Sequence, residues 1–461
     1  MIPDRALGSL TEFLGAENII TKREDLQPYA SDATKLTFMP DAVAFPRSAG
    51  DVSGILSLAS LEGFPVIPRG AGSGKSGGAL PVRGGLVLAM DRFDRILRID
   101  PNNLIAKVET GVITSRFQEE VEKLDLFYPP DPASIKISTI GGNVAENAGG
   151  LRAVKYGVTR DYVLGLTAVL PTGEIIQTGV ETAKGVVGYD LTRLLVGSEG
   201  TLAVITDVNL RLIPKPEATR TMMALFHSVS AAVCAVTGIL RSKIIPTALE
   251  LMDKLCIDCV RDELPASIPS PCEALLLIEV DGDKSLTKKE VKKTREICLG
   301  SGAFQFRAPS GKKEVEKLWE ARRNVSPSVY KLKPDKVSED IVVPRSRMAE
   351  LVLFLDELGR KYHFPIPAYG HAGDGNMHVN IMYDKSVPGE VAKLDQVIQD
   401  LFRKVIEMHG TISGEHGIGI TKAPYLEMEL SREAVQLMIR LKNAFDPRGI
   451  LNPGKIFPYR T

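Results

Sequence analysis

The sequence has no long hydrophobic run and no surplus of charge of either sign. Nothing in its 461 residues approaches the roughly 18 consecutive apolar residues of a membrane span. Residues 1–20 contain Asp4, Glu12 and Glu17 and lack the apolar stretch of a signal peptide. Lys+Arg and Asp+Glu each number 57, so no net positive field attracts nucleic acid or an anionic membrane. These absences predict a cytoplasmic protein without a transmembrane segment and without a nucleic-acid partner.

Cysteine is scarce and unevenly placed. The chain has five cysteines, all in its second half, and an odd number without a secretion signal predicts free thiols. Cys256 and Cys259 form a C-x-x-C pair, but the residues around them have the hydrophobic period of a helix. No second cysteine pair stands at zinc spacing. We therefore predict buried helix residues, with a metal or redox site as the alternative.

Short apolar segments and helical patterns alternate along the chain. From residue 41 a strand, a helix and a strand follow one another, and residues 162–179 contain two strand patterns around a Pro-Thr-Gly turn. Pro214 and Pro216 mark a domain boundary. After residue 220 the pattern favours an antiparallel sheet covered by helices. The predicted fold class is α+β, in two domains.

A glycine-rich loop over residues 68–80 follows a predicted strand. It contains Gly72, Gly74 and Gly77 at the spacing of the dinucleotide-binding fingerprint. That fingerprint requires a helix directly after the glycines, and the residues that follow here are too rich in glycine and proline to form one. The pattern therefore does not predict a Rossmann domain.

The same loop nearly matches the phosphate-binding motif of nucleotide hydrolases. Lys75 and Ser76 follow a glycine, but Arg69 occupies the position of the first required glycine, and the helix is again missing. What remains is a nest of backbone N–H groups that binds a phosphate without a helix, with an ordinary surface turn as the alternative. A valine at Gly74 should resist the backbone angles that the nest needs and intrude on the phosphate.

Two more glycine clusters follow. Residues 129–157 hold serine, threonine and asparagine side chains between glycine pairs and have few bulky apolar residues. We expect a loop without regular structure, and loops of about 20 residues in a compact domain are usually functional. A solvated surface loop is the alternative. The third cluster, residues 197–201, leads into a strand pattern.

Three of the six histidines lie in two polar motifs near residues 371 and 415. The two-residue period of a strand places His378 and Asn380 on one face, and a tight turn before them would bring His371 to the same place. Glu415 would complete a set of two imidazoles and one carboxylate, which suits Zn²⁺, Mn²⁺ or Fe²⁺. A structural polar cluster is one alternative. A zinc hydrolase, a function of another class, would leave the glycine segments without a purpose.

The three glycine segments resemble a known arrangement. Residues 69–78, 130–150 and 197–206 are similar, in that order, to the FAD-contacting segments of the vanillyl-alcohol oxidase, or PCMH-type, flavoproteins. The second half resembles the FAD-linked oxidase C-terminal domain. The strongest resemblance is to the group that contains glycolate oxidase, D-lactate dehydrogenase and D-2-hydroxyglutarate dehydrogenase.

The resemblance implies a PCMH-type FAD-binding domain over residues 1–215. Residues 216–461 would form the FAD-linked oxidase C-terminal domain, which binds substrate and metal and whose tail, residues 445–461, returns to the flavin. The first histidine of the chain is His227, so histidyl attachment in the first domain is excluded and the FAD is expected to be non-covalent. The implied FAD contacts are Arg69, Gly70, Ala71, Gly72, Ser73, Gly74, Ser76, Gly77, Pro130, Ser134, Ser138, Thr139, Gly142, Asn143, Asn147, Gly149, Gly150, Glu199, Gly200, Ile205 and Asn452.

The resemblance also implies a reaction. His371, His378 and Glu415 would hold the divalent metal, with Asn380 and His416 at the substrate. A 2-hydroxy acid would chelate the metal, which lowers the pKa of its hydroxyl group, so that His416 takes the proton while the C2 hydride goes to flavin N5. The expected activity is FAD-dependent oxidation of a D-2-hydroxy acid to the 2-oxo acid.

A substrate carboxylate needs a cation, and a guanidinium group suits it best. Arg322 matches the substrate arginine of the group, with a surface salt bridge as the alternative. Relatives that act on a larger diacid have threonine where this chain has Ser326, and their lysine matches Lys336 only loosely. We therefore expect D-lactate or glycolate as the substrate, with D-2-hydroxyglutarate as the alternative.

The electrons must leave the reduced flavin. This chain has no cysteine cluster that could hold an iron–sulfur center. The alternative to a self-sufficient enzyme is a catalytic flavin subunit that passes electrons to an iron–sulfur or electron-transfer flavoprotein partner. Such a partner would also allow peripheral attachment to a membrane, and a homodimer is compatible with the sequence.

Overall fold

The chain forms two compact units, each built from more than one stretch of sequence. The structure is a computed structural model that describes residues 1–182, 184–264 and 268–457. The first unit comprises Met1–Gly149, Val158–Lys215 and Glu415–Thr461. The second comprises Gly150–Gly157 and Pro216–Gly414. The chain therefore changes unit after Gly149, Gly157, Lys215 and Gly414.

One sheet of the first unit begins with the expected strand-helix-strand order. Helix α3, Ala49–Glu62, starts at Ser48, whose side chain accepts a hydrogen bond from the N–H of Asp51, and it ends at Gly63 in the left-handed region. The helix connects two strands that both lie parallel to a third strand between them. The strand order is β1 (Ile19–Ile20), β2 (Ala42–Ala44), β4 (Leu86–Ala89) and β3 (Val66–Arg69).

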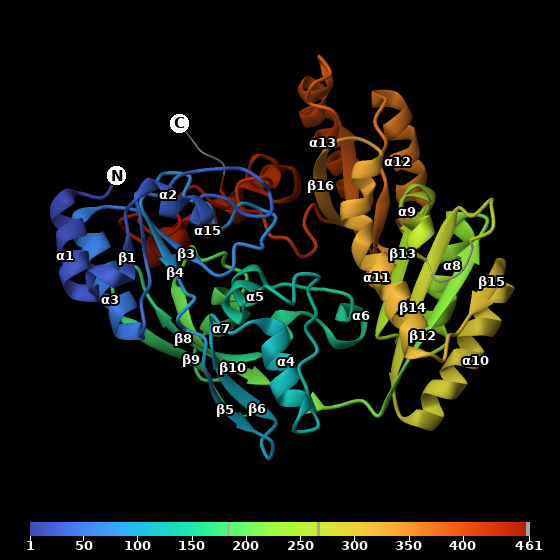
Figure 1. Cartoon of the computed structure of the whole chain (residues 1–461), viewed down its shortest axis with the longest axis horizontal. Coiled ribbons are helices and arrows are strands. Elements are labelled where there is room, and N and C mark those ends of the chain that lie inside the picture. The colour runs from blue at the N-terminus through green and yellow to red at the C-terminus, as the bar shows by residue number, and fades with distance from the viewer. Residues whose placement is uncertain (183, 265–267, 458–461) are drawn as a thin grey trace. The chain divides into compact units, whose positions relative to one another are not determined.

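The other large sheet of this unit is antiparallel. Its strands β8 and β9 form the hairpin that the Pro-Thr-Gly turn predicts. Figure 1 shows this sheet in the blue-green part of the chain. The strand order is β5 (Ile96–Asp100), β6 (Ile105–Glu109), β10 (Val204–Arg211), β8 (Val163–Val169) and β9 (Ile175–Gly179). Other elements of the unit are α1 (Asp4–Leu14), α2 (Arg23–Leu26), α4 (Thr114–Glu122), β7 (Leu126–Phe127), α7 (Leu191–Leu195), β11 (Ile213–Pro214), α14 (Leu426–Glu429) and α15 (Arg432–Phe445).

The second glycine region is not wholly without regular structure, contrary to our prediction. Residues Ile140–Glu146 form helix α5, although two of its residues are glycines. The side chain of Thr139 accepts a hydrogen bond from the N–H of Gly142 and so caps the helix. A Cβ atom at Gly141 would lie 2.5 Å from the Cβ atom of Thr110. Close packing at this glycine therefore outweighs its low helix propensity.

The second unit contains a fully antiparallel sheet, as the sequence predicts. Figure 1 shows it in yellow-green to orange. Its neighbouring strands pair in long registers, for example Ala218 with Gly282 at one end of the β12–β14 pair and Phe226 with Ala274 at the other. The strand order is β15 (Ala303–Arg307), β12 (Ala218–Phe226), β14 (Ala274–Gly282), β13 (Ala248–Asp253), β17 (Ala368–His371), β18 (Asn376–Tyr383) and β16 (Asp335–Val342).

Helices cover this sheet, as Figure 1 shows. Cys256 and Cys259 lie in one of them and are buried, which confirms the prediction of buried helix residues. They pack in one apolar cluster with Leu277, Leu318 and Met382. The helices are α8 (Val229–Arg241), α9 (Lys254–Val260), α10 (Lys284–Gly300), α11 (Lys312–Ser328), α12 (Met348–Tyr362) and α13 (Glu390–Glu407).

The chain returns to the first unit earlier than the sequence led us to expect. We expected the return over residues 445–461, but the first unit resumes at Glu415. The carboxylate of Glu199 accepts hydrogen bonds from the N–H groups of Ile418 and Gly419, at 2.8 and 2.6 Å. These bonds fix the residues after Glu415 to the first unit.

A short segment of the second glycine region belongs to the second unit. Helix α6, Ala153–Tyr156, lies within it. The Lys155 ammonium group forms an ion pair with the carboxylate of Asp281, and the Tyr156 hydroxyl donates to the same carboxylate. This buried carboxylate therefore holds the segment to β14.

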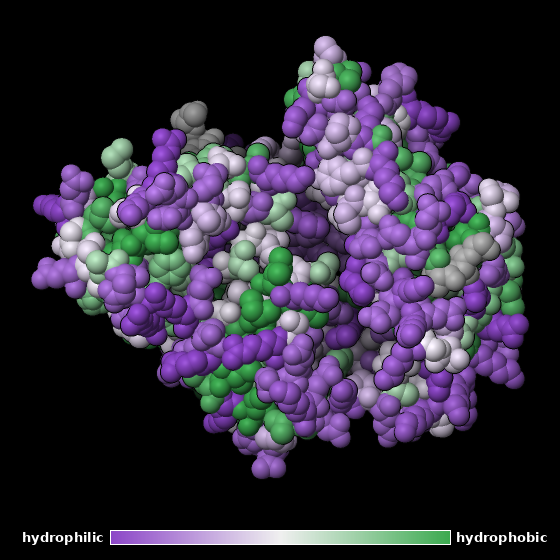
Figure 2. All heavy atoms as spheres, in the orientation of Figure 1, coloured by the Kyte–Doolittle hydropathy of each residue, from purple (hydrophilic) through white to green (hydrophobic). Residues whose placement is uncertain are grey.

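Most of the surface in Figure 2 is hydrophilic, and hydrophobic side chains gather around β5, β6 and β10. Within residues 1–182, 184–264 and 268–457, no helix is both long and apolar enough to cross a membrane.

Candidate functional site

The predicted phosphate-binding loop lies against the start of α5 in the first unit. No helix follows its glycines, as expected. A Cβ atom at Gly70 would overlap Oγ1 of Thr139, so the two segments touch there. A cavity of about 210 Å³ opens beside this contact. It is lined by Gly70, Ala71, Asp91, Asp94, Gly111, Ile113, Arg116 and Thr139.

The third glycine segment joins the other two. The N–H groups of Gly197 and Glu199 donate to the carbonyl groups of Val144 and Ala145 in α5, at 2.9 and 2.8 Å. The side-chain amide of Asn452 donates to the carbonyl oxygens of Glu199 and of Gly78 in the first loop, at 2.8 and 2.9 Å. The structure therefore brings together three segments that are far apart in the sequence.

The end of the chain reinforces this arrangement. The N–H group of Ile420 donates to the carbonyl of Ser76 at 2.8 Å. The buried Lys455 ammonium group donates to the carbonyl of Leu80 at 2.6 Å and to Oδ1 of Asn452 at 3.1 Å. Burial lowers the pKa of Lys455 to about 8. We had named Asn452 but not Ile418, Gly419 and Ile420, whose contribution is made by backbone atoms and leaves no side-chain signal.

Two carboxyl groups lie beside the loop, that of the buried Glu199 and that of the half-buried Glu146. Burial raises the pKa of Glu146 well above its usual range, and the carboxylates of Glu199 and Asp32 raise it further. Burial also raises the pKa of Glu199, against the N–H groups of Ile418 and Gly419, which lower it. This direction favours the neutral form of Glu146, which places no negative charge beside the loop.

The side chains of several predicted FAD contacts form hydrogen bonds within the first unit. The Arg69 guanidinium group donates to the carbonyl of Ser31 at 2.8 Å, and the Asn143 amide donates to Oγ1 of Thr114 at 2.8 Å. Oδ1 of Asn147 accepts from the N–H of Arg160 at 2.9 Å. These hydrogen bonds stabilise the conformation of the first two glycine segments.

The other predicted contacts lie mostly on the same segments. The carbonyl of Pro130 accepts from Gln118, that of Ser134 accepts from the N–H of Ser138, and Ile205 lies on β10. Gly150 directly follows Gly149 and is the first residue of the short segment that belongs to the second unit.

Substitution of Gly74 tests whether the loop binds a phosphate. The backbone angles of Gly74 differ from those that the sequence predicts. Its backbone is not in the left-handed region, whereas Gly72 and Gly77 have φ of +65° and +80°. The prediction of strained backbone angles at Gly74 is therefore wrong. A Cβ atom there would have nothing nearer than Oε1 of Glu146 at 3.9 Å, so it would point into open space.

We expect Gly74→Val to fold normally and to bind FAD at least about tenfold more weakly, because the new side chain fills space that the diphosphate needs. Flavin absorbance after gel filtration measures the bound FAD. Gly311→Val is the control, because that glycine also has open space around it but lies in the second unit. A Gly74→Val protein with wild-type FAD affinity would contradict a phosphate site at this loop.

His371 and His378 lie on one face of the sheet in the second unit. Strands β17 and β18 form a hairpin in which His371 pairs with Asn376 and Tyr369 pairs with His378. The rings of His371 and His378 lie 5.2 Å apart, nearly at right angles. Both side chains are buried. Asn380, also buried, is in hydrogen-bond contact with the Ser338 hydroxyl at 3.1 Å.

A carboxylate that we did not predict lies beside them. Asp340 on β16 is fully buried, and its Oδ1 lies 3.7 Å from Nδ1 of His378. Its two oxygens also accept from the side-chain amide of Asn376 and the N–H of Gly414, at 2.6 and 2.9 Å. Glu415 and His416 follow Gly414 directly and belong to the first unit. Two imidazoles and a carboxylate within the second unit are donors of the kind that bind Zn²⁺, Mn²⁺ or Fe²⁺.

Arg322 forms a salt bridge, but a buried one and not the surface pair that we considered. It lies on α11, and its Nε and Nη2 atoms donate to Oε2 of Glu250 at 2.9 and 2.5 Å. The other oxygen of Glu250 lies 2.6 Å from Nδ1 of His371. Burial alone would raise the pKa of Glu250, but the charges and hydrogen bonds of His371 and Arg322 lower it below its usual value. No motif marks Glu250 in the sequence, because its immediate neighbours on β13 are apolar.

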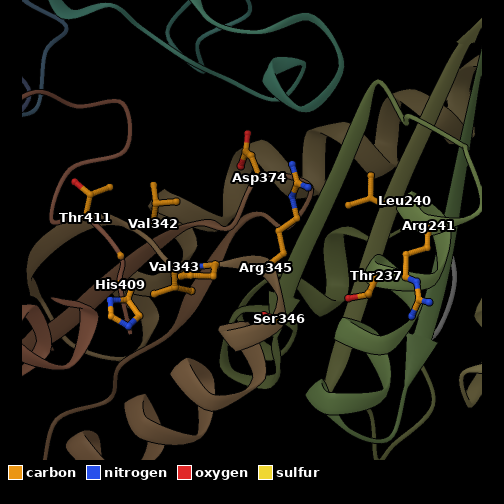
Figure 3. A pocket seen from close by; sticks show the side chains of 12 residues that line it. Thr237, Leu240, Arg241, Val342, Val343, Arg345, Ser346, Asp374, His409 and Thr411 are labelled. Atoms are coloured by element: carbon orange, nitrogen blue, oxygen red, sulfur yellow. The ribbon is translucent and has the colours of Figure 1, made fainter. Parts of the chain in front are cut away.

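A cavity of about 680 Å³ opens elsewhere in the second unit (Figure 3). Arg241, Arg345 and His409 line it together with Thr237, Asp374 and Thr411. None of the predicted site residues lines it, so it does not identify the site.

Comparison with known proteins identifies the family. Residues 40–179 match an FAD binding domain, and residues 215–456 match the family "FAD linked oxidases, C-terminal domain". The chain belongs to the FAD-linked oxidases. This FAD-linked oxidase is 45% identical over 458 residues to the glycolate oxidase subunit GlcD of Bacillus subtilis (strain 168), and the match covers 99% of this chain and 97% of that protein. It is 35% identical over 428 residues to a D-lactate dehydrogenase of Anaerostipes hadrus, covering 90% and 89% of the two chains.

The fold of this FAD-linked oxidase is also that of a solved structure. The structure of p-cresol methylhydroxylase with substrate bound matches with a TM-score of 0.81 at 17% identity, over 98% of this chain and 96% of that one. The predicted α+β architecture, a PCMH-type FAD-binding domain followed by an FAD-linked oxidase C-terminal domain, is confirmed. The oxidase family also confirms an FAD-dependent oxidoreductase and gives no support to the zinc hydrolase.

Proposed function

We propose that this FAD-linked oxidase oxidises a D-2-hydroxy acid, D-lactate or glycolate, to the 2-oxo acid. The observation that carries the proposal is the buried set of Arg322, His371, His378 and Asn380 on one face of the second unit's sheet. The guanidinium group of this set can bind a substrate carboxylate, and its two imidazoles can bind a metal. Its amide can form a hydrogen bond with a polar group of the substrate. The names of the relatives, glycolate oxidase subunit and D-lactate dehydrogenase, support this substrate class.

The protein's own residues have separate tasks in this proposal. Arg322 binds the substrate carboxylate through the N–H groups that Glu250 does not use. His371, His378 and Glu415 would hold the divalent metal, Asn380 would orient the substrate, and His416 would take the hydroxyl proton. When bound, the metal would lower the pKa of the substrate hydroxyl and non-covalent FAD would accept the hydride.

Anaerobic visible spectra test the proposal. The purified protein, with FAD and Mn²⁺ or Zn²⁺, is mixed separately with D-lactate, glycolate, D-2-hydroxyglutarate and L-lactate. We expect the flavin bands to bleach with D-lactate or glycolate and to stay unchanged with L-lactate. A flavin that none of these acids reduces would overturn the proposed substrate class.

A diacid such as D-2-hydroxyglutarate is a second candidate, supported by one contact. The Lys336 ammonium group donates to the carbonyl and to the hydroxyl oxygen of Ser326, at 3.1 and 3.0 Å. Lys336 is on β16, two residues before Ser338, which contacts Asn380, so it faces the same side of the sheet. It could therefore bind a second carboxylate.

Lys336→Ala separates the two candidates. If the natural substrate is D-lactate or glycolate, kcat/KM for it should change less than about threefold. If it is the diacid, kcat/KM for D-2-hydroxyglutarate should fall at least about 30-fold, because a charge-assisted contact of about 2 kcal/mol is lost. Lys333→Ala is the control, because Lys333 pairs with Glu390 away from this contact.

We further propose that the chain works as the flavin subunit of a complex. One relative's name, glycolate oxidase subunit, supports this role. An iron–sulfur protein or an electron-transfer flavoprotein would then take electrons from the reduced flavin. Rapid flavin reduction by substrate together with slow reoxidation by O₂ would support such a partner.

A further inference from the structure

Glu250 joins two groups to which the proposed function gives different tasks. We propose that it is a positioning residue that holds the substrate arginine and a metal-binding histidine of this oxidase in one fixed geometry. The inference rests on the function proposed above and adds a residue that contacts neither substrate nor metal itself.

Glu250 lies on β13 inside the sheet of the second unit. It is fully buried and pairs in register with His371 on the neighbouring strand β17. Its Oε1 contacts Nδ1 of His371 at 2.6 Å, and its Oε2 accepts both Nε and Nη2 of Arg322, at 2.9 and 2.5 Å. The carboxylate of Glu250 therefore links His371, which is on a strand, to Arg322, which is on a helix.

The contact with His371 determines which ring nitrogen is left for a metal. Because a carboxylate only accepts hydrogen bonds, this contact requires a proton on Nδ1 of His371, and in the neutral ring that leaves the lone pair on Nε2. A carboxylate behind a histidine ligand also fixes the ring orientation and makes the ligand more basic. Glu250 thereby prepares His371 to bind a metal through Nε2.

The contact with Arg322 determines the plane of the guanidinium group. Two of its five N–H groups point to Glu250, and its Cζ atom lies 4.6 Å from the centre of the Tyr369 ring. The remaining N–H groups keep a fixed direction for a substrate carboxylate. Glu250 thus orients both the imidazole of His371 and the guanidinium group of Arg322. It thereby also sets the distance between the subsites for the carboxylate and the hydroxyl group of a 2-hydroxy acid.

A glutamine cannot do both tasks. Its side chain has the same length, but it offers one oxygen acceptor and one NH₂ donor. If the oxygen faces Arg322, the NH₂ group faces Nδ1 of His371 and favours the tautomer with the proton on Nε2, which blocks metal binding there. If the amide is turned the other way, NH₂ faces the N–H groups of Arg322 and displaces the guanidinium group.

The test compares E250Q with E279Q. Glu279 is the matched control, because it lies on the adjacent strand β14 and accepts a hydrogen bond at 3.1 Å from the Trp319 side chain, which is on the same helix as Arg322. The Mn²⁺ dissociation constant of the FAD-loaded protein is measured by electron paramagnetic resonance without substrate. KM and kcat are then measured with the acid that reduces the wild-type flavin.

We expect E250Q to bind Mn²⁺ about 10- to 100-fold more weakly and to have a KM at least about tenfold higher, with its FAD content unchanged. E279Q should match the wild type in all three. If E250Q does not fold, E250D replaces it, because aspartate keeps the charge but is too short to reach both partners, and the same two losses are expected.

Two outcomes would overturn the inference. Only the second of them would also overturn the proposed function. An E250Q or E250D protein with wild-type Mn²⁺ affinity and wild-type KM refutes the positioning role and leaves the proposed function intact. A wild-type protein that binds no Mn²⁺ and whose flavin no hydroxy acid reduces refutes the proposed function as well.

Discussion

Replacing His378 by alanine is expected to remove the bound divalent metal and to slow turnover at least about 10³-fold, while FAD remains bound. The physical reason is that a metal that polarises the substrate contributes several kcal/mol to the transition state. FAD should stay because the three glycine segments that would hold it lie in the first unit, apart from Gly150, whereas His378 lies in the second. Metal analysis by mass spectrometry, flavin absorbance and steady-state kinetics measure the three properties.

The control for this variant is His227→Ala. His227 is also in the second unit, but it stacks on Phe304 and contacts the carbonyl of Pro271, outside the predicted site. It should keep its metal, FAD and turnover. A His378→Ala protein with full activity, or a wild-type protein that stays fully active after removal of its metal by a chelator, would refute the metal-assisted mechanism.

Deleting residues 415–461 is expected to prevent the first unit from folding and to abolish FAD binding. Ile450 and Leu451 are buried in the core of this unit together with Val66. The backbone groups of Val66 also exchange hydrogen bonds with the carbonyl of Ile450 and the N–H of Asn452, at 2.9 and 2.8 Å. The deletion exposes this core and removes the amide of Asn452 from the glycine segments. Solubility, thermal unfolding and flavin absorbance report the loss.

A pair of point variants tests whether the effect of the deletion comes from the loss of buried core residues. Leu451 is fully buried, whereas Leu437 on α15 is 52% exposed. Leu451→Asp should destabilise the protein by roughly 4 kcal/mol or more, because it buries a charge in an apolar core. Leu437→Asp should behave like the wild type. A truncated chain, residues 1–414, that is soluble and binds FAD normally would contradict this account.

The sequence was sufficient for the features that depend on local pattern. The alternation of apolar and polar residues predicted the strand with His378 and Asn380 on one face, and the Pro-Thr-Gly turn predicted the hairpin of β8 and β9. The absence of a helix after Gly77 was also predictable, because glycine and proline are poor helix formers. These predictions needed only residues that are near one another in the chain.

The features that depend on tertiary packing were not predictable in this way. Helix α5 forms in a glycine-rich region because Thr139 caps it and Thr110 packs against Gly141. Glu250 and Asp340 belong to no recognisable motif, and their importance appears only when strand pairing brings them to His371 and His378. No short motif carries that information.

The discontinuous first unit has a consequence for how the protein is made. A ribosome releases residues 216–414, which form nearly all of the second unit, before it has synthesised Leu451 and Asn452. Domains tend to fold as units during synthesis, so the second unit can reach its native state while the earlier-made first unit still lacks part of its core. We infer that FAD incorporation waits until Leu451 and Asn452 have left the ribosome and have completed the first unit.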